Sequence, residues 1–316
     1  QCGMMVSAVY WSIVALTFPV SILVDRWSRR KTIGIMAVIW SIATGMCALT
    51  KTLPQLLTAR TFIGVGEAGY APGGTAMIAG LYPQEKRSWM MGLWNASIPL
   101  GSAIGIALGG IIATHWGWRH AFGLVAIPGL IVALLFFFVK DYKTVSLTKT
   151  NSVSDRKTER KAVTMSIKDM LNEFINKPSL IFTYFGMAGV VFTTTSLLTW
   201  LPTYFHRVQG LPESQSGLKS SAVMVLALIG APLGGYIADR WRKKKVNARL
   251  LFPTLSTLLS AIMLFLAFVV FPGKMQYILL LTMGVLITAF VSAASAVTQD
   301  VVHAGMRAMS YAVAVV

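Results

Sequence analysis

Long apolar runs separated by short polar segments dominate the pattern of this chain. A membrane-spanning helix needs about 20 mostly apolar residues, and most of the runs approach or exceed that length. Because the runs are unbroken instead of alternating apolar and polar positions, they predict helices and not the strands of a membrane barrel. The predicted spans cover roughly residues 4–24, 33–50, 54–81, 88–113, 120–139, 178–204, 217–238, 249–271 and 276–299, and a tenth begins near residue 308.

The composition supports this interpretation. Of the 316 residues, 55% are hydrophobic and 12% are charged, with a mean hydropathy of +0.66, whereas soluble domains carry about 25% charged residues. A disordered chain and an ordinary soluble domain are therefore excluded. We predict an all-α integral membrane protein with about nine full spans and the start of a tenth, for which the lipid bilayer is the first partner.

The net charge of +17 could indicate nucleic acid or an anionic surface, but its distribution favours membrane topology. Alternate loops are rich in basic residues, which is the pattern of cytoplasmic loops. We therefore expect a multi-pass protein of the cell (inner) membrane and no nucleic-acid partner. The basic-rich segments are 26–31, 86–87, 140–177, 240–249 and Arg307, and the loops between them hold Lys51, Arg119, Arg207, Lys219 and Lys274.

A polar segment, residues 140–177, divides the chain. It is rich in Ser, Thr and Lys, and its second half begins with a capping-box pattern at Ser166 followed by apolar residues at helical spacing. This predicts a cytoplasmic linker with a short surface helix that stops before Pro178. The predicted domains are thus an N-terminal helical bundle (1–139), the linker (140–177) and a C-terminal helical bundle (178–316).

A charged motif occurs once on each side of the linker. Asp25-Arg26-Trp27-Ser28-Arg29-Arg30-Lys31 recurs as Asp239-Arg240-Trp241-Arg242-Lys243-Lys244-Lys245, and a small residue, Ser21 or Gly235, lies four positions before each aspartate. Arg87 and Arg307 form a weaker second match. The two halves are therefore predicted to be structural repeats, as in secondary transporters.

This duplicated motif resembles motif A of the major facilitator superfamily, whose members have twelve spans in two six-helix halves. The resemblance implies that 1–139 holds family helices 2–6, that 178–316 holds helices 7–10 and the start of 11, and that the first helix and the last one to two are absent. It also implies a gating role for Asp25, Arg26, Arg29, Arg30, Asp239, Arg240, Arg87 and Arg307. Asp25 would face the start of the eleventh helix, near Arg307, and Asp239 the start of the fifth, near Arg87.

One predicted span carries two charges. The segment from Arg60 through Gly64, Gly66 and Glu67 to Tyr70 resembles the fourth helix of spinster-type lipid transporters and of proton-coupled organic-anion symporters. Buried charges are costly and are functional candidates by default. Glu67 would then carry the coupling proton and Arg60 would bind an anionic group of the substrate. The alternative is a structural charge pair between helices.

Further polar residues on the spans are candidates for lining a substrate cavity: Tyr10, Tyr70 and Asn95. The glycines at 64, 66 and 69, and those at 101, 105 and 109, predict close helix packing. No His or Cys residues have metal-ligand spacing, so we expect neither a metal, a cofactor nor an enzyme. The predicted function is a secondary active transporter that works by alternating access. It would be proton-coupled and carry a small organic anion or an amphipathic lipid; a receptor or a channel on the same fold is the alternative.

Overall fold

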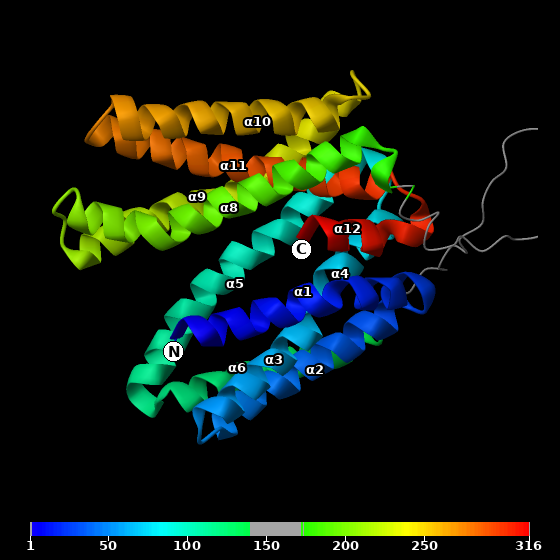
Figure 1. Cartoon of the computed structure of the whole chain (residues 1–316), viewed down its shortest axis with the longest axis vertical. Helices are drawn as coiled ribbons and strands as arrows, with labels where there is room; N and C mark the ends of the chain where they lie inside the picture. Colours follow the sequence, from blue (N-terminus) through cyan, green and yellow to red (C-terminus); the bar gives the residue numbers. More distant parts are fainter. Residues whose placement is uncertain (1, 140–171, 173, 316) are drawn as a thin grey trace, which may run out of the picture. The chain divides into compact units, whose positions relative to one another are not determined.

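The computed structural model describes residues 2–139, 172 and 174–315, and all regular elements in this part of the chain are helices (Figure 1). The predicted all-α class is therefore confirmed. Most of the predicted surface helix at 166–177 lies outside the described residues. Seven described segments are long and apolar enough to cross a membrane: Ser7–Arg26, Arg29–Leu49, Trp118–Phe136, Pro178–Arg207, Gln215–Arg242, Ala248–Val270 and Lys274–Asp300.

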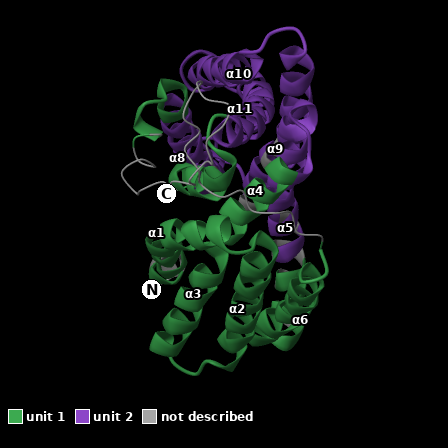
Figure 2. Cartoon of the chain, turned by 90° about the vertical axis from the view of Figure 1, so that its right-hand side faces the viewer, with its two compact units in different colours: residues 1–80, 108–181, 301–316 green, residues 81–107, 182–300 purple. Residues whose placement is uncertain are grey.

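The helices form two compact units, each with segments from before and after the polar segment 140–177 (Figure 2). Unit 1 contains residues 1–80, 108–181 and 301–316, and unit 2 contains residues 81–107 and 182–300. The division of the chain into domains 1–139, 140–177 and 178–316 stays a prediction.

Unit 1 is built from α1 (Cys2–Arg26), α2 (Arg29–Leu49), α3 (Leu53–Glu67), α4 (Tyr70–Leu81), α6 (Trp118–Phe136) and the last turns of α5 (Arg87–Trp116), with the 3₁₀ turn η3 (Ala304–Met306) and α12 (Arg307–Val315). Here α2 packs beside α3 and α6, and α1 packs beside α3 and α12. Capping side chains fix the starts of two helices. Ser28 accepts from the backbone nitrogen of Lys31, and Thr52 and Gln55 form a capping box.

The predicted span 54–81 is interrupted, since α3 ends at Glu67 and α4 begins at Tyr70. Pro72 has no backbone N–H and so cannot bond to the carbonyl of Ala68, which breaks the helical hydrogen-bond pattern. Glu67 therefore lies at a break between two helices and not inside one continuous helix.

The glycines around Glu67 mark close contacts between helices, as predicted. A Cβ on Gly64 would lie 2.4 Å from the carbonyl oxygen of Val9 on α1, and one on Gly66 would lie 2.6 Å from the backbone nitrogen of Trp40 on α2. Only glycine permits backbones to approach this closely. Glycine at these positions thus holds α3 against both of its neighbours.

Unit 2 contains the 3₁₀ turn η1 (Gln84–Lys86), the first turns of α5, α8 (Pro178–Arg207) from residue 182 onward, and the helices α9 (Glu213–Arg242), α10 (Ala248–Phe265) and α11 (Lys274–Asp300). The π-helical turn η2 (Leu266–Val270) extends α10. Here α11 packs beside α9 and α10. The predicted packing role of Gly101, Gly105 and Gly109 on α5 is wrong for the described part of the chain, because a Cβ added at any of them meets nothing within 4 Å.

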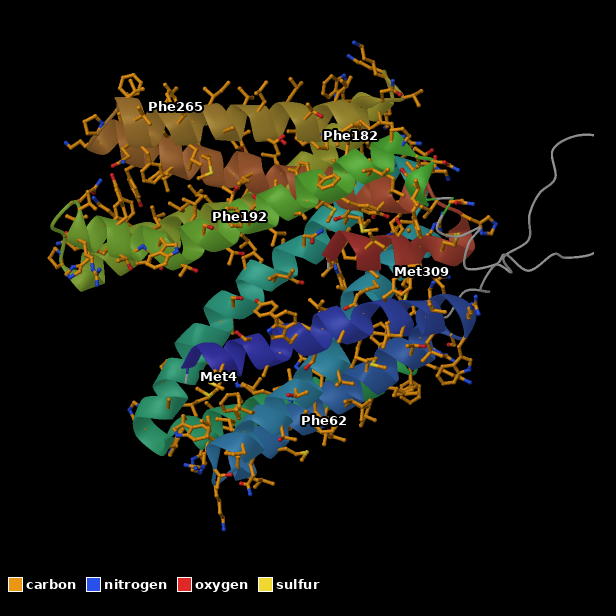
Figure 3. All side chains as sticks on the ribbon, viewed as in Figure 1. Met4, Phe62, Phe182, Phe192, Phe265 and Met309 are labelled. Atoms are coloured by element: carbon orange, nitrogen blue, oxygen red, sulfur yellow. The ribbon has the colours of Figure 1, made fainter. Side chains whose placement is uncertain are left out.

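Large apolar side chains cover the outside of the helices, as expected for a surface solvated by lipid tails. Figure 3 labels Phe182 and Phe192 on α8 and Phe265 on α10, whose side chains are 75%, 75% and 60% exposed. By contrast, the buried set includes many small and polar residues, such as Ser292 and Ser295 on α11. Membrane proteins pack their helices through such residues.

Candidate functional site

The first aspartate of the repeat caps the start of α12. Asp25, at the end of α1, is buried and accepts hydrogen bonds from the backbone nitrogens of Ala308 (3.2 Å) and Met309 (3.0 Å). Arg29, the first residue of α2, donates to the same carboxylate at 3.0 Å. The first N–H groups of a helix have no partner within the helix and carry partial positive charge, so a carboxylate stabilises them. We call this set of contacts the Asp25 cap.

The second aspartate makes the equivalent contact with α5. Asp239, near the end of α9, is buried and accepts from the backbone nitrogens of Ser88 (3.3 Å) and Trp89 (2.9 Å). Gly235, one turn earlier, makes this approach possible, because a Cβ there would lie 2.2 Å from the carbonyl oxygen of Ser88. We call these contacts the Asp239 cap.

The two caps are related by the sequence repeat. In each, the aspartate meets the two residues that follow the arginine opening a helix, Arg87 for α5 and Arg307 for α12. Both arginines also follow a 3₁₀ turn, η1 or η3. The small residue before the aspartate differs. Ser21 is buried and donates its hydroxyl to the carbonyl of Phe18 at 2.7 Å, so serine fits where the second copy has Gly235.

A cluster of four charged residues surrounds the Asp239 cap. Arg249, at the start of α10, pairs with Asp239 at 2.5 Å and also with Asp300 at the end of α11. Asp300 pairs in turn with Arg87. All four side chains are largely buried, with exposed fractions of 13% or less. Buried charges are tolerated when each has a partner of opposite sign, and this cluster joins the ends of α9 and α11 to the starts of α5 and α10.

The remaining residues of the predicted gating motif lie near these caps with other contacts. Arg307 donates to the carbonyl of Ala79 at 3.1 Å, and Arg30 donates to the carbonyl of Val139 at 3.2 Å. Arg240 is exposed and donates to the hydroxyl of Tyr236 at 3.2 Å. Arg26 is exposed. In the described part of the chain, Arg26 and Arg240 thus do not bind the two capping carboxylates.

Arg60 and Glu67 both lie on α3 in unit 1, and both side chains are half-buried. They do not form an ion pair with each other or with any other described residue, which agrees with the two helical turns between them. The guanidinium of Arg60 lies 5.5 Å from the ring centre of Phe122, and its Nε has no hydrogen-bond partner among the described residues. A structural charge pair between described helices is therefore not present.

The three predicted cavity residues differ in surroundings. Tyr70 packs edge-to-face on Trp40 with ring centres 5.6 Å apart, close in sequence to Glu67. Tyr10 on α1 is 64% exposed. Asn95 on α5 donates to the carbonyl of Met91 on its own helix at 2.7 Å. Of the three residues, Tyr70 is thus the one that lies close in sequence to Arg60 and Glu67.

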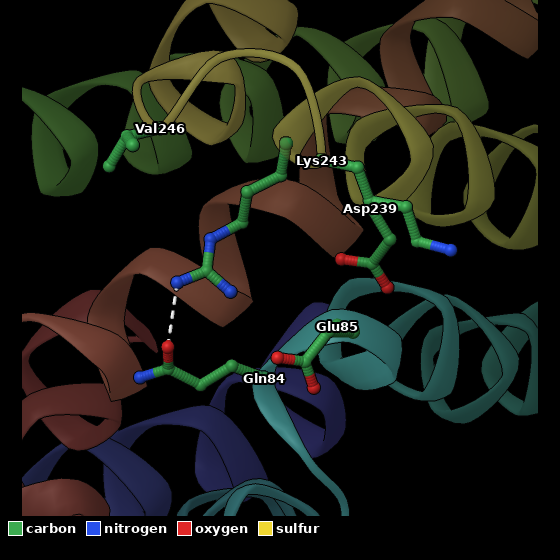
Figure 4. Close-up of a pocket in the computed structure, with 6 residues that line it drawn as sticks. Gln84, Glu85, Asp239, Lys243 and Val246 are labelled. Carbon is green, nitrogen blue, oxygen red and sulfur yellow. Dashed lines mark hydrogen bonds between the residues drawn. The ribbon is translucent and has the colours of Figure 1, made fainter.

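A pocket of about 220 Å³ lies beside the Asp239 cap in unit 2 (Figure 4). Arg242, one of its lining residues, donates to the Oε1 of Gln84 at 2.7 Å, which is the dashed line in Figure 4. Its lining combines acidic, basic and amide side chains with one aliphatic residue: Gln84, Glu85, Asp239, Arg242, Lys243 and Val246. At this volume the pocket is too small to hold the body of a lipid, and the capping residue Asp239 itself forms part of its wall.

Two members of the charged cluster were not predicted as site residues. Arg249 falls in the basic-rich segment 240–249, and Asp300 directly follows the predicted span 276–299. The available signal for Asp300 was an acidic residue at the end of a long apolar run. No pattern in the sequence pairs Arg249 with residues on three other elements.

Comparison with known proteins gives the same family as the motif. The chain matches the model of the Major Facilitator Superfamily over residues 1–316. Among curated relatives, it is 26% identical over 253 residues to a hexuronate transporter of Bacillus subtilis, covering 80% of this chain and 58% of the relative. It is 23% identical over 290 residues to the probable galactarate/D-glucarate transporter GudP of Escherichia coli, covering 84% of this chain and 64% of the relative. It is 26% identical over 262 residues to spinster homolog 1 of Xenopus laevis, covering 77% of this chain and 48% of the relative. The chain thus spans roughly half to two thirds of the length of these relatives, all of which are named as transporters or spinster proteins and not as enzymes.

Solved structures share the fold. The transporter FucP, in its outward conformation, has a TM-score of 0.77 at 16% identity, with 100% of this chain and 78% of that chain covered. A bacterial homologue of the human lysosomal transporter spinster has a TM-score of 0.58 at 21% identity, with 98% of this chain and 72% of that chain covered. With a family match along the whole of the given sequence and solved transporters that share its helical fold, this integral membrane chain belongs to the major facilitator superfamily.

Proposed function

We propose that the protein is a secondary active transporter that moves a small organic anion across the membrane by alternating access, with protons as the coupling ion. The observation that carries the mechanism is the pair of equivalent aspartate caps. Each is a buried carboxylate on one helix bound to the free N–H groups of another helix, a contact that can form in one conformation and break in another. Positive-inside topology alone needs basic residues and no aspartates.

The substrate class rests on Arg60 and on the relatives. Arg60 has an unused donor at Nε, and guanidinium groups bind carboxylates with two parallel hydrogen bonds. Relatives named for hexuronate and galactarate/D-glucarate carry sugar acids, which present such carboxylates. We therefore favour a sugar acid or similar organic anion as the substrate. An amphipathic lipid is the alternative, because the relatives include a spinster protein.

The coupling residue in this proposal is Glu67. Its carboxyl is half-buried at the break between α3 and α4 and forms no hydrogen bond with described residues. Burial disfavours the charged form of a carboxyl group, so such a group readily accepts a proton. Glu67 would load a proton while Arg60 binds the anion. Tyr10, Tyr70 and Asn95 are proposed to contribute to the substrate site.

Orientation follows the charge pattern. The basic loops, including residues 140–177, would be cytoplasmic, and the protein would lie in the cell (inner) membrane. Both aspartate caps sit at the basic ends of their helices, next to Arg26–Lys31 and Arg240–Lys245. They would therefore hold the cytoplasmic side closed until the transporter changes conformation.

The test is uptake of a labelled hexuronate into proteoliposomes that contain the protein. We expect uptake that saturates with substrate concentration and that is driven by an inward proton gradient. Collapse of the gradient with a protonophore should reduce accumulation to equilibration. Flux that rises linearly with concentration and ignores the gradient would indicate a channel, and no flux of any tested anion or lipid would favour a non-transporting receptor.

A further inference from the structure

We propose that the basic segment 240–245, which comprises the last turn of α9 and the first residues of the loop to α10 and is called the basic loop below, binds the phosphate groups of anionic membrane phospholipids. The loop carries five cationic side chains within six residues. It covers the end of one membrane-spanning segment, Gln215–Arg242, and precedes the next, Ala248–Val270, and so lies at the level of lipid headgroups. This inference concerns a surface outside the proposed substrate site and does not depend on which substrate is carried.

Four of the five cations of this loop are exposed, whereas Arg242 is partly buried and donates to Gln84. Lys243, Lys244, Lys245 and Arg240 are exposed, and none of them forms an ion pair with a residue that the structure describes. Arg249, a few residues later, is instead buried and paired with two aspartates. The positive charge of Arg249 is thus balanced by two carboxylates. The exposed cations have no such partner, so their positive charges repel one another. An external anion removes that repulsion.

The backbone of the loop is ordered. The carbonyl of Trp241 accepts from the backbone nitrogens of Lys244 (2.9 Å) and Lys245 (3.0 Å), and the carbonyl of Lys245 accepts from that of Ala248 (3.1 Å). These bonds hold the backbone of the three lysines in one short turn. Binding an anion there does not require the loop to fold first, which lowers the entropic cost of binding.

The surroundings favour a lipid over a water-soluble polyanion. Apolar side chains are exposed in the loop and on both helices beside it: Val246 (82%) in the loop, Ile237 on α9 and Leu251 on α10. Acyl chains cover such a surface, whereas a nucleic acid or an acidic peptide would leave it in water. Clusters of lysine and arginine next to a membrane helix attract anionic lipids, with each cation contributing to the affinity.

The position of the loop gives lipid binding a structural consequence. The loop connects Asp239 on α9 to Arg249 on α10, the two residues that pair in the Asp239 cap. Lys243 and Val246 also line the pocket beside that cap, together with Glu85 (Figure 4). A lipid phosphate held by the loop restrains this turn and so stabilises the cap.

The experiment measures retention of phosphatidylglycerol by native mass spectrometry of the protein extracted in mild detergent, with phosphatidylcholine as the neutral lipid. The variant is K243Q/K244Q/K245Q. The matched control is K51Q/R207Q/K274Q, which removes the same charge from the loops of the other membrane side. We expect the loop variant to bind phosphatidylglycerol about a hundredfold more weakly, while phosphatidylcholine retention stays constant and the control binds as the unmodified protein does.

A second readout keeps the test independent of folding. Phosphatidylglycerol should raise the thermal unfolding midpoint of the unmodified protein and of the control, but not of the loop variant, because a ligand of the folded state stabilises it. Equal loss of lipid in both triple variants would overturn the proposal, since it would reflect net charge alone. Displacement of the lipid by inorganic phosphate at similar concentration would also overturn it, because the site would then prefer a free anion.

Discussion

The carboxylate of Asp239 lies 2.9 Å from the backbone nitrogen of Trp89, a residue 150 positions earlier in the chain. The repeat places Asp25 in the same relationship to Met309, at 3.0 Å and 284 positions apart. Each aspartate of the repeated motif thus binds the start of a helix that is far from it in the sequence. The predictions below test what these contacts, and the charges on α3, contribute.

Removing Arg249 should destabilise the protein strongly. In R249Q, the buried carboxylates of Asp239 and Asp300 both lose their shared cation, and breaking a buried pair in this way costs about 3–5 kcal/mol. We expect a clear fall in the thermal unfolding midpoint in detergent. The double variant R249Q/D300N should recover part of the loss, because one of the two uncompensated charges is removed.

The control for this experiment is R240Q, on the same helix as Asp239. Arg240 is exposed, so its substitution should change stability by no more than about 0.5 kcal/mol. An R249Q protein as stable as R240Q would contradict the role assigned to the charged cluster.

Gly235 should not tolerate even one added methyl group. In G235A the new Cβ would lie 2.2 Å from the carbonyl oxygen of Ser88, so α5 and α9 must move apart and weaken the hydrogen bonds from Ser88 and Trp89 to Asp239. We expect a lower unfolding midpoint. G101A on α5 is the control, since nothing lies within 4 Å of the added Cβ. It should leave stability unchanged or raise it by up to about 1 kcal/mol through higher helix propensity.

Replacing Glu67 should uncouple transport from protons. E67Q keeps the size of the side chain but cannot release a proton, so we expect exchange of substrate across the membrane without accumulation driven by a pH gradient. The measurement is hexuronate uptake into proteoliposomes at two external pH values. E85Q, which removes an exposed carboxyl from η1, should retain gradient-driven uptake. Persistent pH-driven accumulation by E67Q would exclude Glu67 as the proton site.

Arg60 variants should separate charge from geometry. R60Q removes the cation and is expected to raise the KM for an organic anion by a factor of about 100 or more, because a charge-assisted pair of hydrogen bonds is lost. R60K retains the charge but not the planar donors, and so should show an intermediate KM. If R60Q transports with an unchanged KM, the anion binds elsewhere.

The sequence predicted the helices well because membrane spans depend on the local composition of each segment. Predicted boundaries such as 178–204 and 276–299 correspond to α8 at Pro178–Arg207 and α11 at Lys274–Asp300. The partners of the two aspartates were also predicted correctly from the resemblance to the family. Arg87 and Arg307 were expected to mark the helix starts, and α5 and α12 begin at those residues.

What the sequence did not predict depends on contacts between distant elements or on details of the backbone. The break after Glu67 has a local signal in Pro72, but apolar composition continues across it and hides it. The glycines of α5 have the spacing of a packing stripe, yet whether a neighbour occupies that face is decided by tertiary structure. The double pairing of Arg249 likewise arises only when the ends of α9 and α11 come together.

The 3₁₀ turns ahead of Arg87 and Arg307 have a consequence for how this chain can vary in length. One residue inserted into either turn would rotate the following helix by about 100° and shift it by about 1.5 Å. The first-turn N–H groups would then face away from their carboxylate. Insertions and deletions should therefore be tolerated at Gly210 or Gly273, where loops turn with positive φ, but not in the four residues that precede α5 and α12.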